Sequence, residues 1–276
     1  PKSVDESAAK KIDGYVGAYV EKNGFARINT GYVVALGETV WAAMNAAKAL
    51  KISWDLGENK NVSSEDIRNE SIKLQQDPSA GFLWVLEGDT DNAMSNAATK
   101  HSAVYETSIA YHGCHEPMNC TAYEKDGIWH LHGGNQWFSM AAPTAAAALG
   151  VEADKVVCHQ YLAGTGFGRR TEPDNFVLAA QTSKYIGRPV KLLFTREQDM
   201  QFDFHRTPTY QVVEGGVEFG RMTAMNHDVV AGWSTKRAAP GFMPDSVDKK
   251  GKVDQFSTNG SDHWYEIPNH KVTTFN

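Results

Sequence analysis

The sequence is poor in cysteine, lacks a long apolar run and carries no excess of basic charge. Its three cysteines, Cys114, Cys120 and Cys158, do not make a disulfide framework and leave the compartment of the protein open. No apolar stretch approaches the roughly 20 residues that a membrane-spanning helix needs. The formal net charge of -6 argues against nucleic acid or an anionic membrane as the main partner.

The remaining composition is that of a globular protein. The 276 residues are 41% hydrophobic and 22% charged, without a low-complexity tract. This length is enough for one large or two modest domains with real cores. The chain begins at Pro1 without a methionine or a signal-like apolar region, so we expect a processed or excised product.

Periodicity and turn signals predict an α+β chain. Residues 12–20 and 31–36 read as strands, and a helix from Glu38 followed by a strand over 51–55 predicts a β-α-β unit. A polar stretch, 56–62, has the character of a linker. Further along, we expect a helix from the capping box at Ser63 to Gln76, a half-buried strand over 99–111, a hairpin of 121–123 with 128–131, a helix over 141–149, a strand at 156–160, a helix over 173–186, a strand at 190–194, and alternating runs without a clear helix over 207–276.

The most informative segment is the loop between the strand at 156–160 and the next helix, with glycines at 164, 166 and 168 and two arginines after it. Glycines allow a backbone to approach a ligand closely, and N–H groups at a helix start suit an anion or an oxo group. The loop lacks the Gly-Lys-Ser/Thr of a phosphate-binding loop. A dinucleotide fingerprint would need a glycine where Arg169 stands. A tight turn without a ligand is the alternative interpretation.

Two other segments have polar residues that could serve chemistry. The run from His112 to Cys120 contains histidines, cysteines and Glu116, but its spacing fits no common zinc pattern. A buried turn that meets a neighbouring loop explains it better. Gln136, after a Gly-Gly-Asn sequence, can cap the following helix or project its amide into a pocket. The charges at 195–208 read on their own as solvated turn residues.

Taken in order, these motifs resemble those of a known enzyme family. The segments are HEPMNCTAYEKDGIWHLHGGNQ, GTGFGRR, KLLFTREQDMQFDFHRTP and YEIPN. They resemble the molybdenum-binding subunit of the xanthine dehydrogenase/aldehyde oxidase family, in the isoquinoline 1-oxidoreductase beta-subunit branch that includes bacterial aldehyde dehydrogenases. The opening GYVVALGETVWAAMNAAKALKISWD resembles the last part of that family's α/β hammerhead domain. The resemblance implies a hammerhead remnant over 1–57 and a first molybdenum-cofactor-binding domain, mixed α/β, over 58–276.

The resemblance also implies a cofactor, partners and site residues. The cofactor is molybdopterin, in bacteria usually its cytosine dinucleotide form. A partner subunit carries [2Fe–2S] clusters, and a cytochrome is a further expected electron acceptor. Gln136 matches the glutamine that donates to the molybdenum oxo ligand, and Gly166, Phe167 and Gly168 match the loop that approaches the metal. Arg206 and Glu116 fall in the substrate pocket, where Glu116 holds the wall rather than reacting, and no side chain of the chain ligates the metal directly.

Two departures from the family pattern shape the expected function. Thr165 replaces a glycine of the loop, and because a β-branched residue resists positive φ, we expect it to alter the turn. The family's catalytic glutamate lies in a later domain, so we expect this chain to be part of a larger subunit and inactive alone. The complete enzyme would oxidise an aldehyde or an N-heterocycle with water as oxygen donor. The branch places it in the periplasm, with the cytoplasm as the alternative.

Two other functions stay open from the residues. A split or degenerate domain kept for subunit assembly fits the missing glutamate and Thr165. A nucleotide-binding α/β domain would use the glycine loop, against which Arg169 counts. Molybdenum analysis of the native complex discriminates the first, and titration with NAD and ATP the second.

Overall fold

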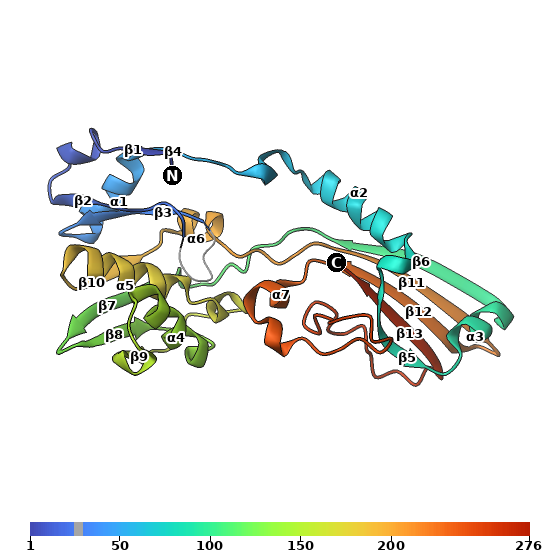
Figure 1. Cartoon of the computed structure of the whole chain (residues 1–276). Helices are drawn as coiled ribbons and strands as arrows, with labels where there is room; N and C mark the ends of the chain where they lie inside the picture. Colours follow the sequence, from blue (N-terminus) through green and yellow to red (C-terminus); the bar gives the residue numbers. More distant parts are fainter. Residues whose placement is uncertain (25–29) are drawn as a thin grey trace. The chain divides into compact units, whose positions relative to one another are not determined.

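The computed structural model describes residues 1–24 and 30–276, which form helices and several sheets (Figure 1). They gather into two compact units, each built from two segments: residues 1–58 with 111–204, and 59–110 with 205–276. This division into compact units does not test the domain boundaries that the family resemblance implies. The hammerhead remnant over 1–57 and the cofactor-binding domain over 58–276 therefore stay predictions.

The N-terminal part of the first unit contains two small antiparallel sheets. In one, β2 (Tyr15–Glu21) pairs with β3 (Tyr32–Gly37); in the other, β1 (Ser3–Asp5) pairs with β4 (Lys51–Ser53). Helix α1 (Val40–Ala49) begins at Thr39, whose side chain accepts a hydrogen bond from the Ala42 N–H. The predicted β-α-β unit is wrong, because β3 and β4 belong to different sheets.

The rest of the first unit is a four-stranded sheet packed on two helices. Its order is β10 (Val190–Leu193), β7 (Asn119–Lys125), β8 (Ile128–Gly133), β9 (Val156–Gln160), with β8 and β9 parallel. Successive side chains of a strand point to opposite faces of the sheet, and Cys120 and Leu131 lie on the buried face. There they pack in a core that α4 (Phe138–Leu149) and α5 (Asp174–Ile186) close. Both helices end on left-handed glycines, Gly150 and Gly187. The short α6 (Arg196–Gln201) follows β10.

The second unit is built on a five-stranded sheet. Its order is β5 (Phe82–Glu87), β13 (Asn269–Phe275), β12 (Arg221–Ala231), β11 (Thr209–Glu218), β6 (Thr99–Thr107). Helices α2 (Ser64–Gln75) and α3 (Thr90–Asn96) pack against the sheet, and the capping box predicted at Ser63 is present. A short α7 (Ser234–Ala238) lies in the stretch that was expected to have no clear helix.

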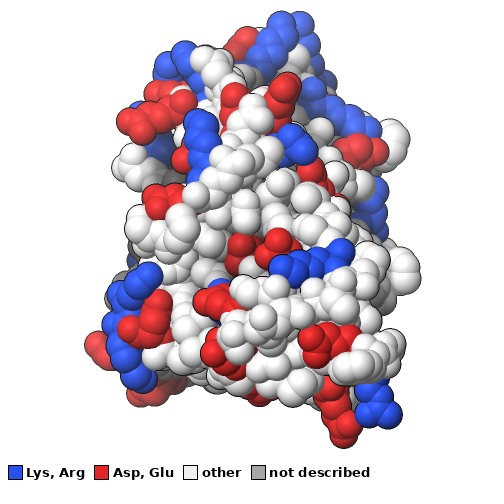
Figure 2. Space-filling model, turned by 90° about the vertical axis from the view of Figure 1, so that its right-hand side faces the viewer, with Lys and Arg blue, Asp and Glu red and all other residues white. Residues whose placement is uncertain are grey.

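Strand β6 differs from its prediction in burial. Its alternating residues predicted a half-buried strand, but all nine residues are exposed. Strand β6 lies at the edge of its sheet, where β11 is its only partner among the described strands (Figure 1). On the face drawn in Figure 2, acidic and basic side chains are interspersed among uncharged ones. Within the described residues, no helix has the length and apolar character to cross a membrane.

Candidate functional site

The glycine loop lies beside the turn that precedes β7, and both belong to the first unit. The Glu116 N–H donates to the Gly164 carbonyl at 3.0 Å, and the Gly164 N–H donates to Glu116 Oε2 at 2.9 Å. One step further, the Cys114 thiol donates to the Gly166 carbonyl at 3.3 Å. The His115 ring meets the Phe167 ring edge to face, with centroids 6.0 Å apart. The run from His112 to Cys120 is therefore a turn whose polar groups meet a neighbouring loop.

Thr165 adopts the conformation that the sequence argued against. Its φ is +69°, so Thr165 takes the positive φ that a β-branched residue resists, and whether the turn is altered stays a prediction. The Thr165 Oγ1 accepts a hydrogen bond from the His115 N–H at 3.0 Å, and the Thr165 carbonyl accepts one from Arg170 Nε at 2.9 Å. These bonds offset a strain of about 1–2 kcal/mol for a left-handed residue with a side chain.

Gln136 does not cap α4; it reaches across to the glycine loop. Its Oε1 accepts a hydrogen bond from the Gly168 N–H at 3.0 Å, which identifies the oxygen end of the amide. Asn135 Oδ1 accepts a hydrogen bond from the Trp137 N–H just before the helix, and no side chain caps the start of α4. Among the described residues, no acceptor takes a hydrogen bond from the Gln136 amide NH₂ group, and the residue is exposed. Gln136 therefore presents two free donors in a fixed orientation.

The loop glycines make room for side chains of the protein itself. A Cβ on Gly166 would lie 2.3 Å from Gln136 Oε1, and a Cβ on Gly164 would lie 2.6 Å from the Glu116 Cβ. The close approach predicted for a ligand is thus, at these two positions, an approach to Gln136 and Glu116. The half-buried Gly166 N–H has no hydrogen-bond partner within residues 1–24 and 30–276. It is a third free donor beside Gln136.

The Arg170 side chain joins the glycine loop to the turn that precedes β7. Its side chain is fully buried, and it donates to the Thr165, Gly134 and Glu116 carbonyls at 2.9, 3.2 and 2.8 Å. It also forms an ion pair with Glu116 Oε2 at 3.0 Å. A guanidinium can hold several acceptors at fixed angles because it has five N–H donors in one plane. Arg170 therefore sets the spacing of the loops.

Arg169 anchors the other side of the loop. Its two terminal nitrogens donate to the Asp174 carboxylate at 2.7 Å each, and its Nε lies 3.0 Å from Asp203 Oδ1. Asp203 also accepts from the His112 N–H at 2.8 Å. Burial alone would raise the pKa of Asp203, but the His112 hydrogen bonds and the Arg169 charge outweigh it and lower that pKa. Asp203 is therefore buried in an ion pair with Arg169, whereas the sequence suggested that the charges over 195–208 are solvated.

The surroundings of the Glu116 carboxylate fix it in place and do not suit it to proton transfer. Both carboxylate oxygens are occupied, Oε1 by Asn119 and Oε2 by Gly164 and Arg170. Burial would raise its pKa, but the Gly164 and Asn119 hydrogen bonds and the Arg170 charge hold that pKa below its usual 4.5. A general acid or base near neutral pH needs a raised pKa, so this environment favours the wall-holding role.

Arg206 belongs to the second unit, whereas the residues described above belong to the first. Its backbone forms an isolated bridge with Ala110, from the Arg206 N–H to the Ala110 carbonyl at 2.9 Å. Its assignment to the substrate pocket stays a prediction. In the described ranges, no three His, Cys, Asp or Glu side chains gather where they could hold a metal ion.

Comparison with known proteins identifies the family. A family model of the molybdopterin cofactor-binding domain matches residues 75–273. The chain belongs to this family. Its α+β fold agrees with that of the aldehyde oxidoreductase from Desulfovibrio gigas, with a TM-score of 0.72 at 18% sequence identity over 99% of this chain and 33% of that one.

Two named relatives each match most of this chain. The chain is 41% identical over 268 residues to "Membrane-bound aldehyde dehydrogenase [pyrroloquinoline-quinone]" of Gluconacetobacter polyoxogenes, covering 96% of this chain and 34% of that protein. It is 26% identical over 258 residues to the isoquinoline 1-oxidoreductase subunit beta of Brevundimonas diminuta, covering 88% and 31%. The chain therefore spans about a third of the length of these relatives.

The residues of the site fit an oxygen-bearing ligand of this cofactor-binding family. Gln136 and Gly166 offer free N–H donors at adjacent points, and the half-exposed Phe167 lies between Gly166 and Gly168. Sequence reasoning missed the supports of this arrangement, Asp174, Asp203 and Arg170. The adjacent arginines directly after the glycines were the available signal, since buried arginines require acceptors.

Proposed function

We propose that this chain forms one wall of the molybdopterin site in a larger molybdenum hydroxylase that oxidises an aldehyde or an N-heterocycle. The observation that carries the proposal is the Gln136 amide, held by Gly168 through its oxygen so that its NH₂ group is free. When bound, the cofactor would supply the two-electron oxidation with oxygen derived from water. The names of the relatives support an aldehyde or an isoquinoline-type substrate for the complete protein.

The residues of the chain would hold and orient the cofactor. Gln136 would donate from its NH₂ group, and Gly166 would donate from its backbone N–H. Arg170 and Glu116 would keep the two loops at the required spacing, because their hydrogen bonds join residues 116, 134, 164 and 165. Fixed donors are effective because they need no reorganisation when charge develops on the bound oxygen.

The finer assignments rest on the family resemblance. They are a cytosine dinucleotide form of the cofactor, a remaining molybdenum-binding domain of the same subunit, an iron–sulfur subunit with [2Fe–2S] clusters, a cytochrome as acceptor and a periplasmic location. The membrane-bound designation of the 41% identical relative supports the location. We further propose that the 276-residue chain alone does not turn over substrate; activity of the purified chain would contradict this.

Metal and pterin analysis of the native protein that contains this chain tests the proposal. We expect molybdenum and pterin in equal amounts, and a large loss of both in Gln136→Ala but not in the control Gln76→Ala, an exposed glutamine on α2's C-terminal side. A native assembly without molybdenum would instead support a domain kept for subunit assembly. Because one relative's name carries pyrroloquinoline quinone, extraction of that quinone without molybdenum would also overturn the proposal.

A further inference from the structure

The outer edge of β6 is an unusually open strand edge. Nine consecutive residues, Thr99 to Thr107, pair with β11 in one continuous register and without a bulge. Each of them is exposed, including Val104 and Tyr105, which are 50% and 59% exposed. No described strand pairs with the other side of β6. A long, regular edge offers a row of backbone N–H and C=O groups to a further strand.

The opposite edge of the same sheet is protected. Strand β5 has six residues, and its register with β13 is broken between Val272 and Thr273. The Val247 N–H donates to the Leu83 carbonyl at 2.8 Å, so a loop covers part of that edge. Short length, irregularity and cover are common means of preventing edge-to-edge association. Strand β6 has none of these within the described part of the chain.

The sequence of β6 is complementary to itself when it is reversed. In an antiparallel pairing centred on Ala103, Lys100 of one copy lies opposite Glu106 of the other, and His101 lies opposite Tyr105. Thr99 likewise meets Thr107, so every position outside the central three has a suitable partner. Opposite charges and threonine pairs on facing positions stabilise antiparallel strands, whereas like charges destabilise them.

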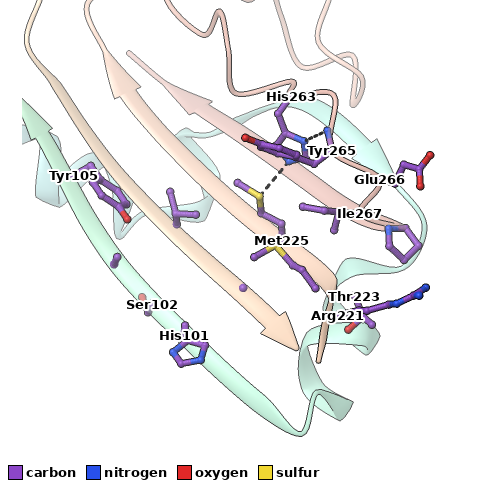
Figure 3. A pocket seen from close by; sticks show the side chains of 15 residues that line it. His101, Ser102, Tyr105, Arg221, Thr223, Met225, His263, Tyr265, Glu266 and Ile267 are labelled. Carbon is purple, nitrogen blue, oxygen red and sulfur yellow. Dashed lines mark hydrogen bonds between the residues drawn. The ribbon is translucent and has the colours of Figure 1, made fainter. Parts of the chain in front are cut away.

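The two faces of β6 are compatible with such a pairing. His101, Ala103 and Tyr105 line an open groove of about 1050 Å³ on one face, which His263 and Tyr265 border (Figure 3). On the other face, Glu106 forms an exposed ion pair with Arg68 on α2. An exposed carboxylate with several acceptor positions can receive a second cation without releasing the first.

We propose that two copies of this chain associate through β6, antiparallel about a two-fold axis at Ala103. The two five-stranded sheets would then form one continuous sheet, and the grooves of the two copies would meet at the axis. A two-fold contact of this kind is closed, because the same patch is used on both partners. The proposal concerns the second unit and is independent of the cofactor.

Charge reversal in the purified full chain tests the pairing. Analytical ultracentrifugation should show a concentration-dependent dimer in the wild type. Lys100→Glu places glutamates opposite each other twice, so dimerisation should weaken about tenfold or more, and Glu106→Lys should act alike. The double variant K100E/E106K restores opposite charges and should return to within about threefold of the wild type.

Controls separate the pairing from general effects of charge. Lys60→Glu makes the same charge change on an exposed residue outside β6 and should leave the dimer unchanged. Arg68→Ala removes the internal partner of Glu106 without reversing a charge in β6, and should also retain the dimer. Circular dichroism of each variant verifies that it is folded.

A cysteine on the axis tests the register directly. Residues facing each other across an antiparallel pair have Cα atoms about 4.5–5.5 Å apart, which suits a disulfide. Ala103→Cys should therefore form an intermolecular disulfide on mild oxidation. Lys100→Cys should not, because its copies would lie about 20 Å apart along the strands. A monomer at all concentrations, a dimer indifferent to charge reversal, or equal cross-linking of both cysteine variants would overturn the proposal; a monomer would leave the β6 edge to a strand of another protein.

Discussion

Arg170 should be the residue of the first unit whose conservative replacement is most damaging. Its fully buried guanidinium donates to three backbone carbonyls and to the Glu116 carboxylate. Arg170→Lys keeps the charge but offers one nitrogen in place of three. We expect the variant to lose the spacing between the glycine loop and the turn before β7, and therefore part of the stability of the first unit.

The magnitude follows from counting the acceptors. One of the three hydrogen bonds is buried and two are partly buried, and a carbonyl that loses its donor in such a place costs about 1 kcal/mol, so three carbonyls set the scale at about 3 kcal/mol. The ion pair adds little, because the Glu116 side chain is 42% exposed and solvent screens it. A lysine that satisfies one carbonyl reduces the loss to about 2 kcal/mol. This is a large share of the stability of an ordinary domain.

The assay must report on the first unit alone, because two units need not unfold together. Hydrogen exchange of the peptide that contains Gly164 and Gly168 does so, since the N–H groups of both donate to Glu116 and Gln136. The control is Arg188→Lys, in an exposed pair with Glu38, which should change stability by less than about 0.5 kcal/mol. A loss below about 1 kcal/mol for Arg170→Lys would refute the reasoning.

Three further predictions concern other groups. Thr165→Gly should leave the free energy of unfolding in urea nearly unchanged, because relief of the left-handed strain offsets the lost hydrogen bond and the added chain entropy. Thr165→Ala loses the same hydrogen bond without relieving the strain and should cost about 1 kcal/mol. Equal losses in the two variants would contradict this. Burial, with nearby histidine charges, lowers the pKa of His227 to about 4 from 6.5, so the unfolded chain binds the extra proton between these values. Stability should thus be fully present above about pH 6.5 and fall towards pH 4 by up to about 3 kcal/mol, with a flatter profile in His227→Phe; an unchanged profile would count against it. Alkylation should reach Cys158 before the fully buried Cys114 and Cys120, and slowly at neutral pH because burial raises the Cys158 pKa to about 11; peptide mass spectrometry would show any other order.

Local elements were predictable because their signals are local. Ser63 caps α2 through a capping box with Asp66, and Gly150 and Gly187 end α4 and α5 in the left-handed conformation. Each of these features depends on a few neighbouring residues and on backbone hydrogen bonds at a helix end. The predicted hairpin is present as β7 and β8, and its turn residues Asp126 and Gly127 both have positive φ.

Pairings and burial were less predictable because they depend on distant segments. Strand β4 pairs with β1, a three-residue strand with no periodic pattern of its own, and this defeated the predicted β-α-β unit. The alternation in β6 correctly indicates a strand, but it cannot tell whether another layer covers either face. Alternation describes which side chains share a face; burial requires a partner for that face.

The glycine loop shows how one departure from a family pattern can be accommodated. Thr165 needs the left-handed conformation in which glycine would be free of strain. Its hydroxyl, however, gives the adjacent turn an acceptor that glycine lacks, and His115 N–H uses it. Since Cys114 and Glu116 bind the residues on either side of Thr165, the strained residue is held from both directions. The free donors of Gln136 and Gly166 are therefore compatible with Thr165, because the two loop residues with side chains at positive φ, Thr165 and Phe167, do not themselves present them.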